Sequence, residues 1–509
     1  FGLEAAEAVL DLRPWPAAPW MVDVMQSLVD QSLLRSWVLG QDAGRPVMRF
    51  GMLVSLQEYA REKLRHDAAV GESRAAEAAE DRHACWYARF GEDTALDGLD
   101  QVHGVERRRA LMPELENLLA ACRRTAARGA GETAVLAYRA AWAVLELRGP
   151  LAVAVDLGNQ ILATPLASAS RARLLQTLGL AKQRSGRIEE ARADFAAALA
   201  LDRELGDRQS EGRTLARLAT IALNDGRMAD ARRELEAALA IHREVGDRRG
   251  EGVALGNLGL ASHEQGRLEE ASAQLEAALA IHREIGNRRS EGIVRGNLAN
   301  LRREQGRIEE ARTFFQDALA IHREVGNRRF EGIALGNLGS LCREQGWLDE
   351  ARKNFEAALA IHREVGARRF EGQALDNVAS VAFAQGRIEE AKREFESSIA
   401  IHREIGNRRA EGIVLGNLGQ LYLAAGQLET AREHLAKAER LLRSEQYQIE
   451  VGKVLCTRSE LERQSGDLQA ADATLGEVAA IATAEGARPD SELGRRLASA
   501  RQALAGDGR

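Results

Sequence analysis

The stretch AIHREVGNRRFEGIALGNLG, residues 320–339, decides the fold because near-copies of it recur along the chain. The copies begin at Ala240, Ala280, Ala360 and Ala400, always forty residues apart, and a looser version begins at Ala200. A fixed period of this length is typical of stacked supersecondary units, none of which can bury its apolar face alone. The period predicts eight repeats in residues 171–490.

Each repeat has the pattern of two helices. In residues 251–290, apolar side chains recur twice at helical spacing, and Gly266 and Gly286 follow the two stretches. Glycine adopts the left-handed conformation that ends many helices. Gly259 and Ala278 are small, which lets the two helices approach closely. We therefore expect an array of helical hairpins.

The pattern resembles the tetratricopeptide repeat (TPR), whose spacing is matched by Leu258-Gly259, Ala271 and Ala278. The forty-residue form is similar to the long TPRs of kinesin light chain and of LGN-type adaptors. This resemblance implies an all-α solenoid whose first helices line a concave groove. The last repeat departs most, since Arg458-Ser459 replaces Leu-Gly, and residues 491–509 are expected to form a capping helix and tail.

The residues before the array follow another pattern. Residues 1–66 contain an apolar helix, a strand-like stretch, the turn GQDAGRP, a short strand and a helix, which together predict a winged-helix module. This module resembles the segment that follows the nucleotide-binding core of bacterial STAND-type (NB-ARC-like) ATPases. Residues 67–130 resemble the helical spacer of such proteins, and residues 131–170 are interpreted as a degenerate repeat.

The resemblance implies an ATPase domain upstream of Phe1, because no GxxxxGK[ST] sequence occurs in these 509 residues. We therefore interpret the chain as part of a longer protein. No catalytic grouping of side chains stands out, so we expect neither enzymatic activity nor a cofactor in this chain.

The composition narrows the class of protein. The net charge of −6 argues against a chain that binds polyanions as a whole, so nucleic acid is not an expected partner. The four cysteines are isolated, which fits a reducing compartment and predicts a cytoplasmic protein. No apolar run approaches ~18 residues, so no membrane contact is expected.

Two further columns of residues recur with the period. The histidines stand one repeat apart, roughly 10 Å, whereas ligands of one metal ion lie ~2 Å from it. They are His242, His282, His322, His362 and His402. We expect them to pack on the second helices.

The Arg248-Arg249 pair and its equivalents are expected to pair with Glu251 and its equivalents. The alternative is a basic ridge that contacts an acidic partner or a neighbouring domain.

An asparagine column is the candidate ligand site. It consists of Asn257, Asn297, Asn337, Asn377 and Asn417. Asparagine is a mediocre mid-helix residue, so its recurrence requires a reason. The TPR resemblance places this position in the groove, where long TPR proteins use it to bind peptide backbone, and an amide both donates and accepts hydrogen bonds. Two alternatives stay open: bridges between adjacent first helices, and remnants of recent duplication.

Positions that differ between repeats predict the selectivity of this groove. Arg295 replaces a leucine, and Arg303 and Arg343 recur in one column with Phe383 and Leu423. These side chains predict a pocket for an acidic, partly apolar segment, although Glu304 and Glu344 stand close enough in sequence to neutralise the arginines.

Two functions follow from these patterns. The first is a sensor arm of a STAND-type switch, which binds a protein or peptide in the groove and controls the upstream ATPase. The second is a structural scaffold or oligomerisation array without a separate ligand. A groove that is free favours the first function, and a groove that is occupied by the chain's own residues favours the second.

Overall fold

The computed structural model describes residues 1–10, 19–42, 45–52, 73–99, 104–489 and 491–507. The chain divides into two compact units. The N-terminal unit comprises Phe1–Leu301 with Glu324–Gly326, and the C-terminal unit comprises Arg302–Arg323 with Asn327–Arg509.

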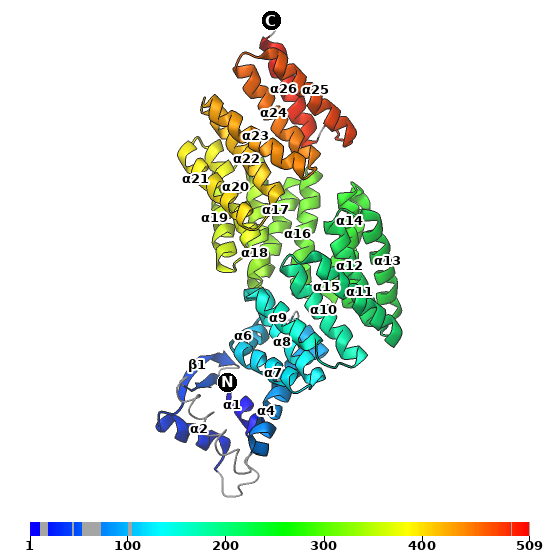
Figure 1. The fold of residues 1–509 in the computed structure, drawn as a ribbon, viewed down its shortest axis with the longest axis vertical. Helices are drawn as coiled ribbons and strands as arrows, with labels where there is room; N and C mark the ends of the chain where they lie inside the picture. Colours follow the sequence, from blue (N-terminus) through cyan, green and yellow to red (C-terminus); the bar gives the residue numbers. More distant parts are fainter. Residues whose placement is uncertain (11–18, 43–44, 53–72, 100–103, 490, 508–509) are drawn as a thin grey trace. The chain divides into compact units, whose positions relative to one another are not determined.

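Eight helical hairpins run from Ser168 to Ala484, a stretch that is described throughout (Figure 1). The first helices are α10 (Ser168–Arg184), α12 (Arg208–Asn224), α14 (Arg248–Glu264), α16 (Arg288–Glu304), α18 (Arg328–Glu344), α20 (Arg368–Ala384), α22 (Arg408–Ala424) and α24 (Gln448–Gln464). The second helices are α11 (Ile188–Leu205), α13 (Met228–Glu244), α15 (Leu268–Glu284), α17 (Ile308–Glu324), α19 (Leu348–Glu364), α21 (Ile388–Glu404), α23 (Leu428–Ser444) and α25 (Leu468–Ala484). This architecture confirms the expected all-α solenoid.

Glycines set both the turns and the distance between the helices. Gly266 and Gly286 adopt φ angles of 72° and 68°, which end the two helices of their repeat as expected. Gly259 lies against the partner helix, where an added Cβ would stand 2.6 Å from Cγ of Leu275. Gly339 meets the ring of Phe355 in the same way, at 2.8 Å. The two helices of a repeat can approach closely only because these positions lack a side chain.

The first helices form one face of each unit, here called the inner face. Neighbouring first helices contact one another directly, α12 with α14 in the N-terminal unit, and α18 with α20, α20 with α22 and α22 with α24 in the C-terminal unit. The second helices pack between successive first helices, as α19 does between α18 and α20.

A buried glutamate joins successive repeats. Glu331, which is 4% exposed, accepts hydrogen bonds from Nε of Arg323 at 3.0 Å and from Nη1 of Arg328 at 2.5 Å. Arg323 ends α17 and Arg328 begins α18, so the carboxylate fixes the turn between two repeats. The same arrangement surrounds Glu211, Glu251, Glu291, Glu371 and Glu411. The expected pairing is thus confirmed for the first arginine of each pair.

The histidine column packs against a glycine of the same repeat. The ring of His362 is buried, and a Cβ added to Gly332 would stand 2.6 Å from its Cε1. His282 covers Gly252 and His402 covers Gly372 in the same way. In the seventh repeat Leu442 takes this place over Gly412. The packing role predicted for these histidines is therefore confirmed.

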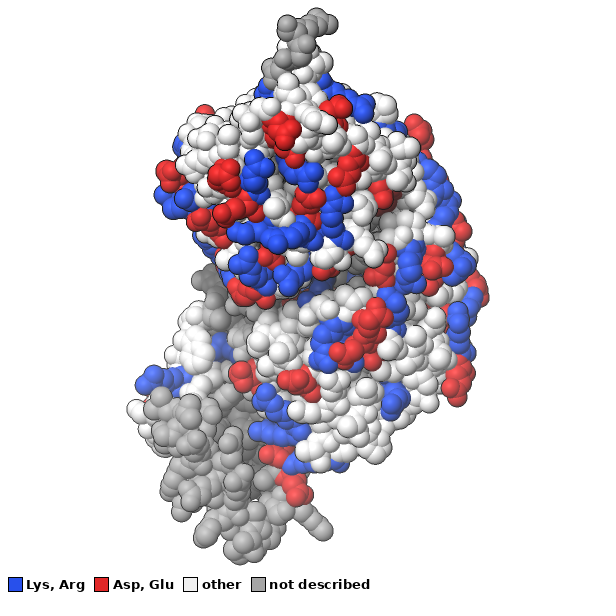
Figure 2. Space-filling view, turned by 45° about the horizontal axis from the view of Figure 1, so that its top comes forward, with Lys and Arg blue, Asp and Glu red and all other residues white. Residues whose placement is uncertain are grey.

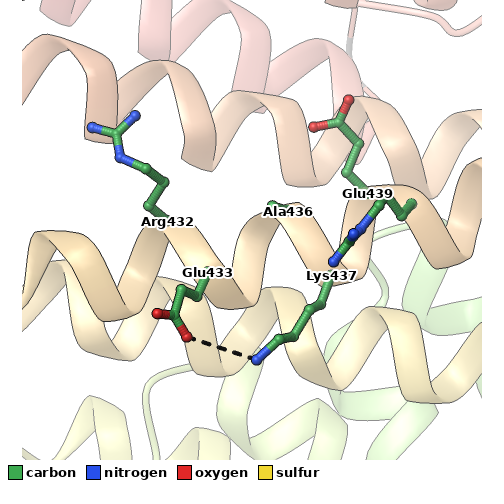
Figure 3. A pocket seen from close by; sticks show the side chains of 6 residues that line it. Arg432, Glu433, Ala436, Lys437 and Glu439 are labelled. Carbon is green, nitrogen blue, oxygen red and sulfur yellow. Dashed lines mark ion pairs between the residues drawn. The ribbon is translucent and has the colours of Figure 1, made fainter.

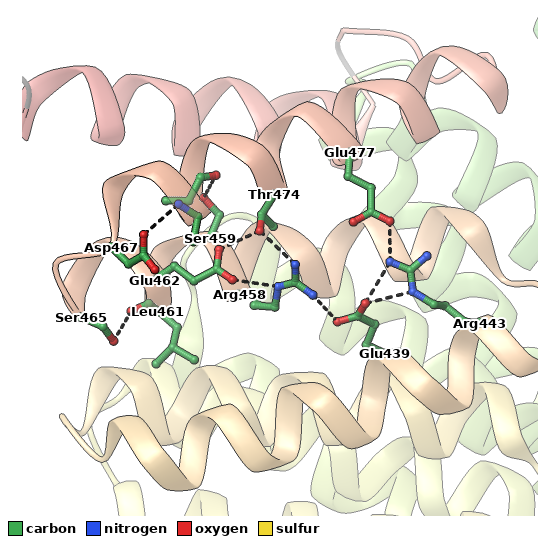
Figure 4. Close-up of polar contacts among 12 residues, drawn as sticks. Glu439, Arg443, Arg458, Ser459, Leu461, Glu462, Ser465, Asp467, Thr474 and Glu477 are labelled. Atoms are coloured by element: carbon green, nitrogen blue, oxygen red, sulfur yellow. Dashed lines mark hydrogen bonds and ion pairs between the residues drawn. The ribbon is translucent and has the colours of Figure 1, made fainter.

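At one position the last repeat replaces an apolar side chain with a polar network. Arg458 stands where the other repeats have a leucine or valine, and its guanidinium donates to Glu439 at 2.7 Å and to Thr474 at 3.0 Å (Figure 4). Thr474 in turn donates to Glu462 at 2.7 Å. The final helix α26 (Glu492–Asp507) packs on α24 and α25, and Leu493 lies over Gly452.

The residues before the array form a hairpin and several helices. They are α1 (Leu3–Val9), α2 (Met21–Asp30), β1 (Arg35–Asp42), β2 (Arg45–Gly51), α4 (Ser73–Ala88), η2 (Arg89–Gly91), α5 (Asp93–Asp97), α6 (Gly104–Leu111), η3 (Met112–Glu114), α7 (Leu115–Ala127), α8 (Gly131–Arg148) and α9 (Leu151–Leu162). Strands β1 and β2 pair antiparallel. The helix predicted after this hairpin, within residues 53–66, lies outside the described residues, so the winged-helix assignment stays a prediction.

The hairpin is tied to the helices by a second buried glutamate. Glu114 pairs with Arg49 of β2 and accepts hydrogen bonds from Oη of Tyr87 at 2.8 Å and from Nδ2 of Asn117 at 2.7 Å. Burial alone would raise the pKa of Glu114, but these three donors hold it below its usual range. The carboxylate therefore stays charged and anchors β2 to α4 and α7.

Leu338→Ala is expected to destabilise one part of the array. Leu338 is buried in α18, and its truncation should lower the free energy of unfolding by about 2–5 kcal/mol. Because each repeat contacts only its neighbours, hydrogen exchange should accelerate first in residues 331–370. A uniform acceleration over all eight repeats would contradict this expectation.

The buried histidines predict a loss of stability in acid. Burial, the largest cause, lowers the pKa of His282 and His362 to about 4, and Arg249 and Arg329 lower it further. The unfolded chain binds these protons near pH 6.5, so the free energy of unfolding should fall as the pH drops from about 6.5 to 4. A variant with leucine at positions 282, 362 and 402, matching Leu442, should show a smaller fall in urea titrations between these pH values. An equal fall in both proteins would show that the imidazoles do not contribute.

Candidate functional site: the inner face of the array

The asparagine column lies on the inner face. In α18, residues 329, 333, 337 and 340 recur three or four positions apart and share one side of the helix. Asn337 is partly exposed there, as are its four equivalents. The structure thus places all five predicted asparagines at corresponding positions of five first helices.

The five asparagines differ in their contacts. Nδ2 of Asn417 in α22 donates to Oδ1 of Asp376 in α20 at 3.0 Å, which is a bridge between adjacent first helices. No hydrogen bond joins the side chains of the other four to any residue that the structure describes; these are Asn257, Asn297, Asn337 and Asn377. Asn417 therefore bridges adjacent first helices, which was one of the two alternatives to ligand binding. The side-chain amides of the other four asparagines keep both their donor and their acceptor available.

Asp376 is the unusual residue of this face. It replaces the glycine that stands at the same position in the neighbouring repeats, as at 336 and 416. Enclosure by the surrounding protein is the largest cause that raises its pKa, to about 6, although the hydrogen bond from Asn417 and the charge of Arg343 oppose the rise. A carboxyl group that titrates near neutral pH can donate or accept a hydrogen bond from a bound ligand.

The predicted selectivity residues have different surroundings. Arg303 lies 3.7 Å from the carboxylate of Glu344, which offsets its charge as expected. Arg343 is exposed, and its charge acts on Asp376. Phe383 packs partly into the core, and Leu423 is buried, so the expectation of an apolar end at Leu423 is wrong.

Arg295 belongs to the N-terminal unit and contacts its own helix. Nη2 of Arg295 lies 3.1 Å from Oε1 of Glu291, four residues earlier in α16. Glu291 is also bound by Arg283 and Arg288, so Arg295 adds a third cation to a buried carboxylate. This pairing gives the replacement of leucine by arginine a structural reason.

Two of the second arginines of the recurring pairs, Arg249 and Arg289, contact helices that precede the array. Arg249 of α14 pairs with Asp97 of α5. Arg289 of α16 lies 3.6 Å from Oε1 of Glu146 in α8, and Arg184 of α10 donates to the same oxygen at 3.0 Å. Part of the inner face of the N-terminal unit is therefore occupied by residues of the same chain.

Arg217 stands at the centre of this region, in the repeat where the asparagine column has an arginine. Its side chain is exposed to solvent, but the enclosure of the inner face lowers its pKa to about 10. Glu146 opposes this lowering, and three nearby guanidinium groups add to it; they are Arg184, Arg249 and Arg289. The four guanidinium groups thus act on one another at this place on the face.

Sequence reasoning missed Asp97, Glu146, Arg217 and Asp376. The last two could have been found as departures from strict columns, because arginine replaces asparagine at 217 and aspartate replaces glycine at 376. Asp97 and Glu146 lie outside the repeats, where no periodicity marks them. Only the folded chain brings them to the array.

Other surface features give weaker evidence for a ligand site. A shallow depression of about 520 Å³ on α23 is lined by Arg432, Glu433, Ala436, Lys437, Glu439 and Arg440 (Figure 3). All six come from one helix, and Glu433 already pairs with Lys437 at 3.8 Å, so the depression is a surface feature and not an enclosed site. On the face drawn in Figure 2, basic and acidic side chains are interspersed.

Among the described residues, no three His, Cys, Asp or Glu side chains converge as metal ligands would. None of the helices that the structure describes combines the length and apolar character needed to cross a bilayer.

Comparison with protein families identifies the repeats. The family model of the MalT-like TPR region matches residues 212–398, and two tetratricopeptide repeat models match residues 370–444 and 172–205. The repeats are tetratricopeptide repeats. The TPR array thus has the fold expected of a protein-interaction module, whereas the kinesin light chain-like type and the winged-helix segment stay predictions. No curated protein sequence matches the chain.

Solved structures share the fold at low sequence identity. The Rap protein complexed with Competence and Sporulation Factor is 13% identical, with a TM-score of 0.50 over 65% of this chain and 98% of that one. A STAND protein with a tetratricopeptide repeat sensor from Pyrococcus horikoshii is 17% identical, with a TM-score of 0.47 over 67% of this chain and 54% of that one. BtubC (BKLC) from P. vanneervenii is 20% identical, with a TM-score of 0.38 over 42% and 91%.

Two single variants separate the roles of the asparagines. Asn417→Ala removes the bond to Asp376 and should cost ~0.5–1.5 kcal/mol, against a gain of a few tenths from helix propensity. Asn337→Ala should show only the gain. Thermal melts at pH 8, where Asp376 is ionised, should therefore place Asn417→Ala below Asn337→Ala. The reverse order would show that the bridge contributes nothing to stability.

Proposed function

We propose that this chain is the protein- or peptide-binding sensor arm of a STAND-type signalling ATPase, with its ligand held on the inner face of the TPR array. The observation that carries the proposal is the row of asparagine amides on first helices, of which Asn337 and Asn377 in the C-terminal unit make no hydrogen bond to any described residue. Each amide can donate to and accept from the backbone of an extended peptide. Repeats roughly 10 Å apart would match about three residues of such a peptide.

The neighbouring residues would select among ligands. Arg343 is exposed on α18 beside the asparagine column, and Asp376 on α20 titrates near pH 6. The ligand would therefore carry an acidic group for Arg343, while Asp376 would accept a donor group. The similar Rap structure, whose complex contains Competence and Sporulation Factor, is consistent with a partner bound by this fold.

The switch itself would belong to another part of the protein. The segment with helix α2 and the β1–β2 hairpin resembles the one that follows the nucleotide-binding core of STAND ATPases, and the proposal assigns the nucleotide to that core. A ligand that binds the arm more tightly in one state of the switch would shift its equilibrium towards that state.

A second function is favoured by the N-terminal unit. There, Asp97 and Glu146 bind Arg249 and Arg289 of the first helices, so the chain's own residues cover part of the inner face. This self-contact supports a scaffold role for these repeats, in which they hold the preceding helices in place.

The double variant Asn337→Ala, Asn377→Ala tests the sensor function. It should keep the melting temperature of the parent, because alanine is the better helix former. The loss of two amide contacts, at ~0.5–1.5 kcal/mol each, should weaken binding roughly fivefold to a hundredfold or more. The measurement is quantitative recovery of the native partner in a pull-down from the host, read by mass spectrometry.

Asn354→Ala is the matched control, since Asn354 lies on the second helix α19 and should leave recovery unchanged. Equal recovery of the same partner by the parent and the double variant would refute the asparagine site. A lower melting temperature of the double variant with unchanged recovery would assign the asparagines to structure instead.

A further inference from the structure

One contact inside the array shows how the asparagine column can hold a carboxylate. Oδ1 of Asp376, on α20, accepts a hydrogen bond of 3.0 Å from Nδ2 of Asn417 on the next first helix, α22. Both side chains lie partly exposed on the inner face. An asparagine at this position can therefore bind an acidic side chain that approaches from the side of the preceding repeat.

The preceding pair of first helices has the same asparagine but lacks the carboxylate. Because the repeat is forty residues long, Gly336 of α18 stands to Asn377 of α20 as Asp376 stands to Asn417. The side-chain amide of Asn377 makes no hydrogen bond to any residue that the structure describes. A Cβ built on Gly336 would meet no atom within 4 Å beyond its own stretch of helix. The open space between Gly336 and Asn377 is here called the Gly336 site.

The other two contacts between first helices of the C-terminal unit differ from this one. Between α20 and α22, the carboxylate of Asp376 already occupies the corresponding place. Between α22 and α24, Thr457 replaces the asparagine. A Cβ built on Gly416 would also stand only 3.0 Å from Cγ2 of Val454 there. Of these three contacts, the one between α18 and α20 alone places a free asparagine amide beside open space.

Two cations of α18 flank the Gly336 site. Arg329 and Arg343 lie seven residues, or about two helical turns, before and after Gly336, so the three share one side of the helix. Cζ of Arg329 lies 5.3 Å from the centre of the Phe370 ring of α20, which places this guanidinium across the same two helices. Both charges favour an anion at the site over a neutral group. Asp376 opposes them from one repeat away, roughly 10 Å.

We propose that the Gly336 site binds an acidic side chain of the ligand, whose carboxylate accepts a hydrogen bond from Nδ2 of Asn377 as Asp376 accepts one from Asn417. This inference rests on the proposed function, since it requires a ligand on the inner face. It adds the class of side chain that is recognised and the repeat that recognises it. A C-terminal carboxylate has the same chemistry, and the binding experiment below separates the two sources.

Gly336→Asp tests the geometry of the site without any ligand. The introduced carboxylate should accept a hydrogen bond from Asn377 at pH 8, where it is ionised. Asn377→Ala should then lower the melting temperature in the Gly336→Asp background. In the parent it should leave the melting temperature unchanged or slightly higher, because alanine is the better helix former. Equal shifts in the two backgrounds would show that the two positions do not interact and would overturn the proposal.

Binding is measured by fluorescence anisotropy with the full chain and two fluorescein-labelled peptides. Oligoglutamate with an amidated C-terminus carries side-chain carboxylates only, and oligoglutamine with a free C-terminus carries the terminal carboxylate only. Gly336→Asp fills the site and should weaken binding of the amidated oligoglutamate roughly tenfold or more, since a hydrogen bond to a charged group is lost. Ala360→Asp is the matched control and should leave the affinity unchanged, because it adds the same charge at an exposed position of the second helix α19.

Three binding results would overturn the proposal. The first is equal affinity of Gly336→Asp and Ala360→Asp for the amidated oligoglutamate, and the second is no binding of that peptide to the parent. The third is tighter binding of the free oligoglutamine, which would assign the site to a C-terminal carboxylate.

The pull-down separates failure of this proposal from failure of the sensor function. If Gly336→Asp recovers the native partner as well as the parent does, while Asn337→Ala, Asn377→Ala loses it, the sensor function stands and the acidic site falls. If the double asparagine variant also recovers the partner in full, the sensor function falls as well.

Discussion

The array depends on a buried carboxylate held by two arginines from two successive helices. A glutamate that is only 4% exposed would be strongly unfavourable without partners, and Arg323 and Arg328 supply them to Glu331 from either side of the turn. Because both arginines keep much of their surface in solvent, the pair loses less hydration than a fully buried ion pair would. The contact ties one hairpin to the next, and the same pair of arginines recurs at six glutamates of the array.

The contacts that pack the repeats do not fix the side chains on the inner face, so these side chains can differ from repeat to repeat. The joints between repeats use the ends of the helices, and the contacts within a repeat use the Gly339–Phe355 type of close approach. Neither involves the middle of the inner side of a first helix. Substitutions there, such as arginine at 217 or aspartate at 376, change the charge of the face without disturbing the joints. The inner face can therefore differ from repeat to repeat while the packing of the repeats stays the same.

The fold could be predicted from the sequence because its determinants are local and periodic. Gly259, Gly266 and the buried Leu258 each act within one hairpin. Eight copies of the same pattern strengthen the prediction of a helical hairpin in each repeat. The candidate site could be predicted only in part. The asparagine column is visible as a column, but the bridge from Asn417 to Asp376 depends on how two hairpins approach. The contacts of Asp97 and Glu146 join residues up to 152 positions apart, and no pattern in the sequence encodes that distance.

Identical joints also make the length of the array adjustable in steps of one repeat. Removing the forty residues 331–370 would bring together two ends that already fit, since Glu331 and Glu371 receive their arginines in the same way. What would change is the number of asparagine positions on the inner face of the C-terminal unit. Unequal exchange between repeats therefore alters the number of asparagine positions while each joint stays the same. The array can gain or lose a repeat without any change in the contacts that join the remaining repeats.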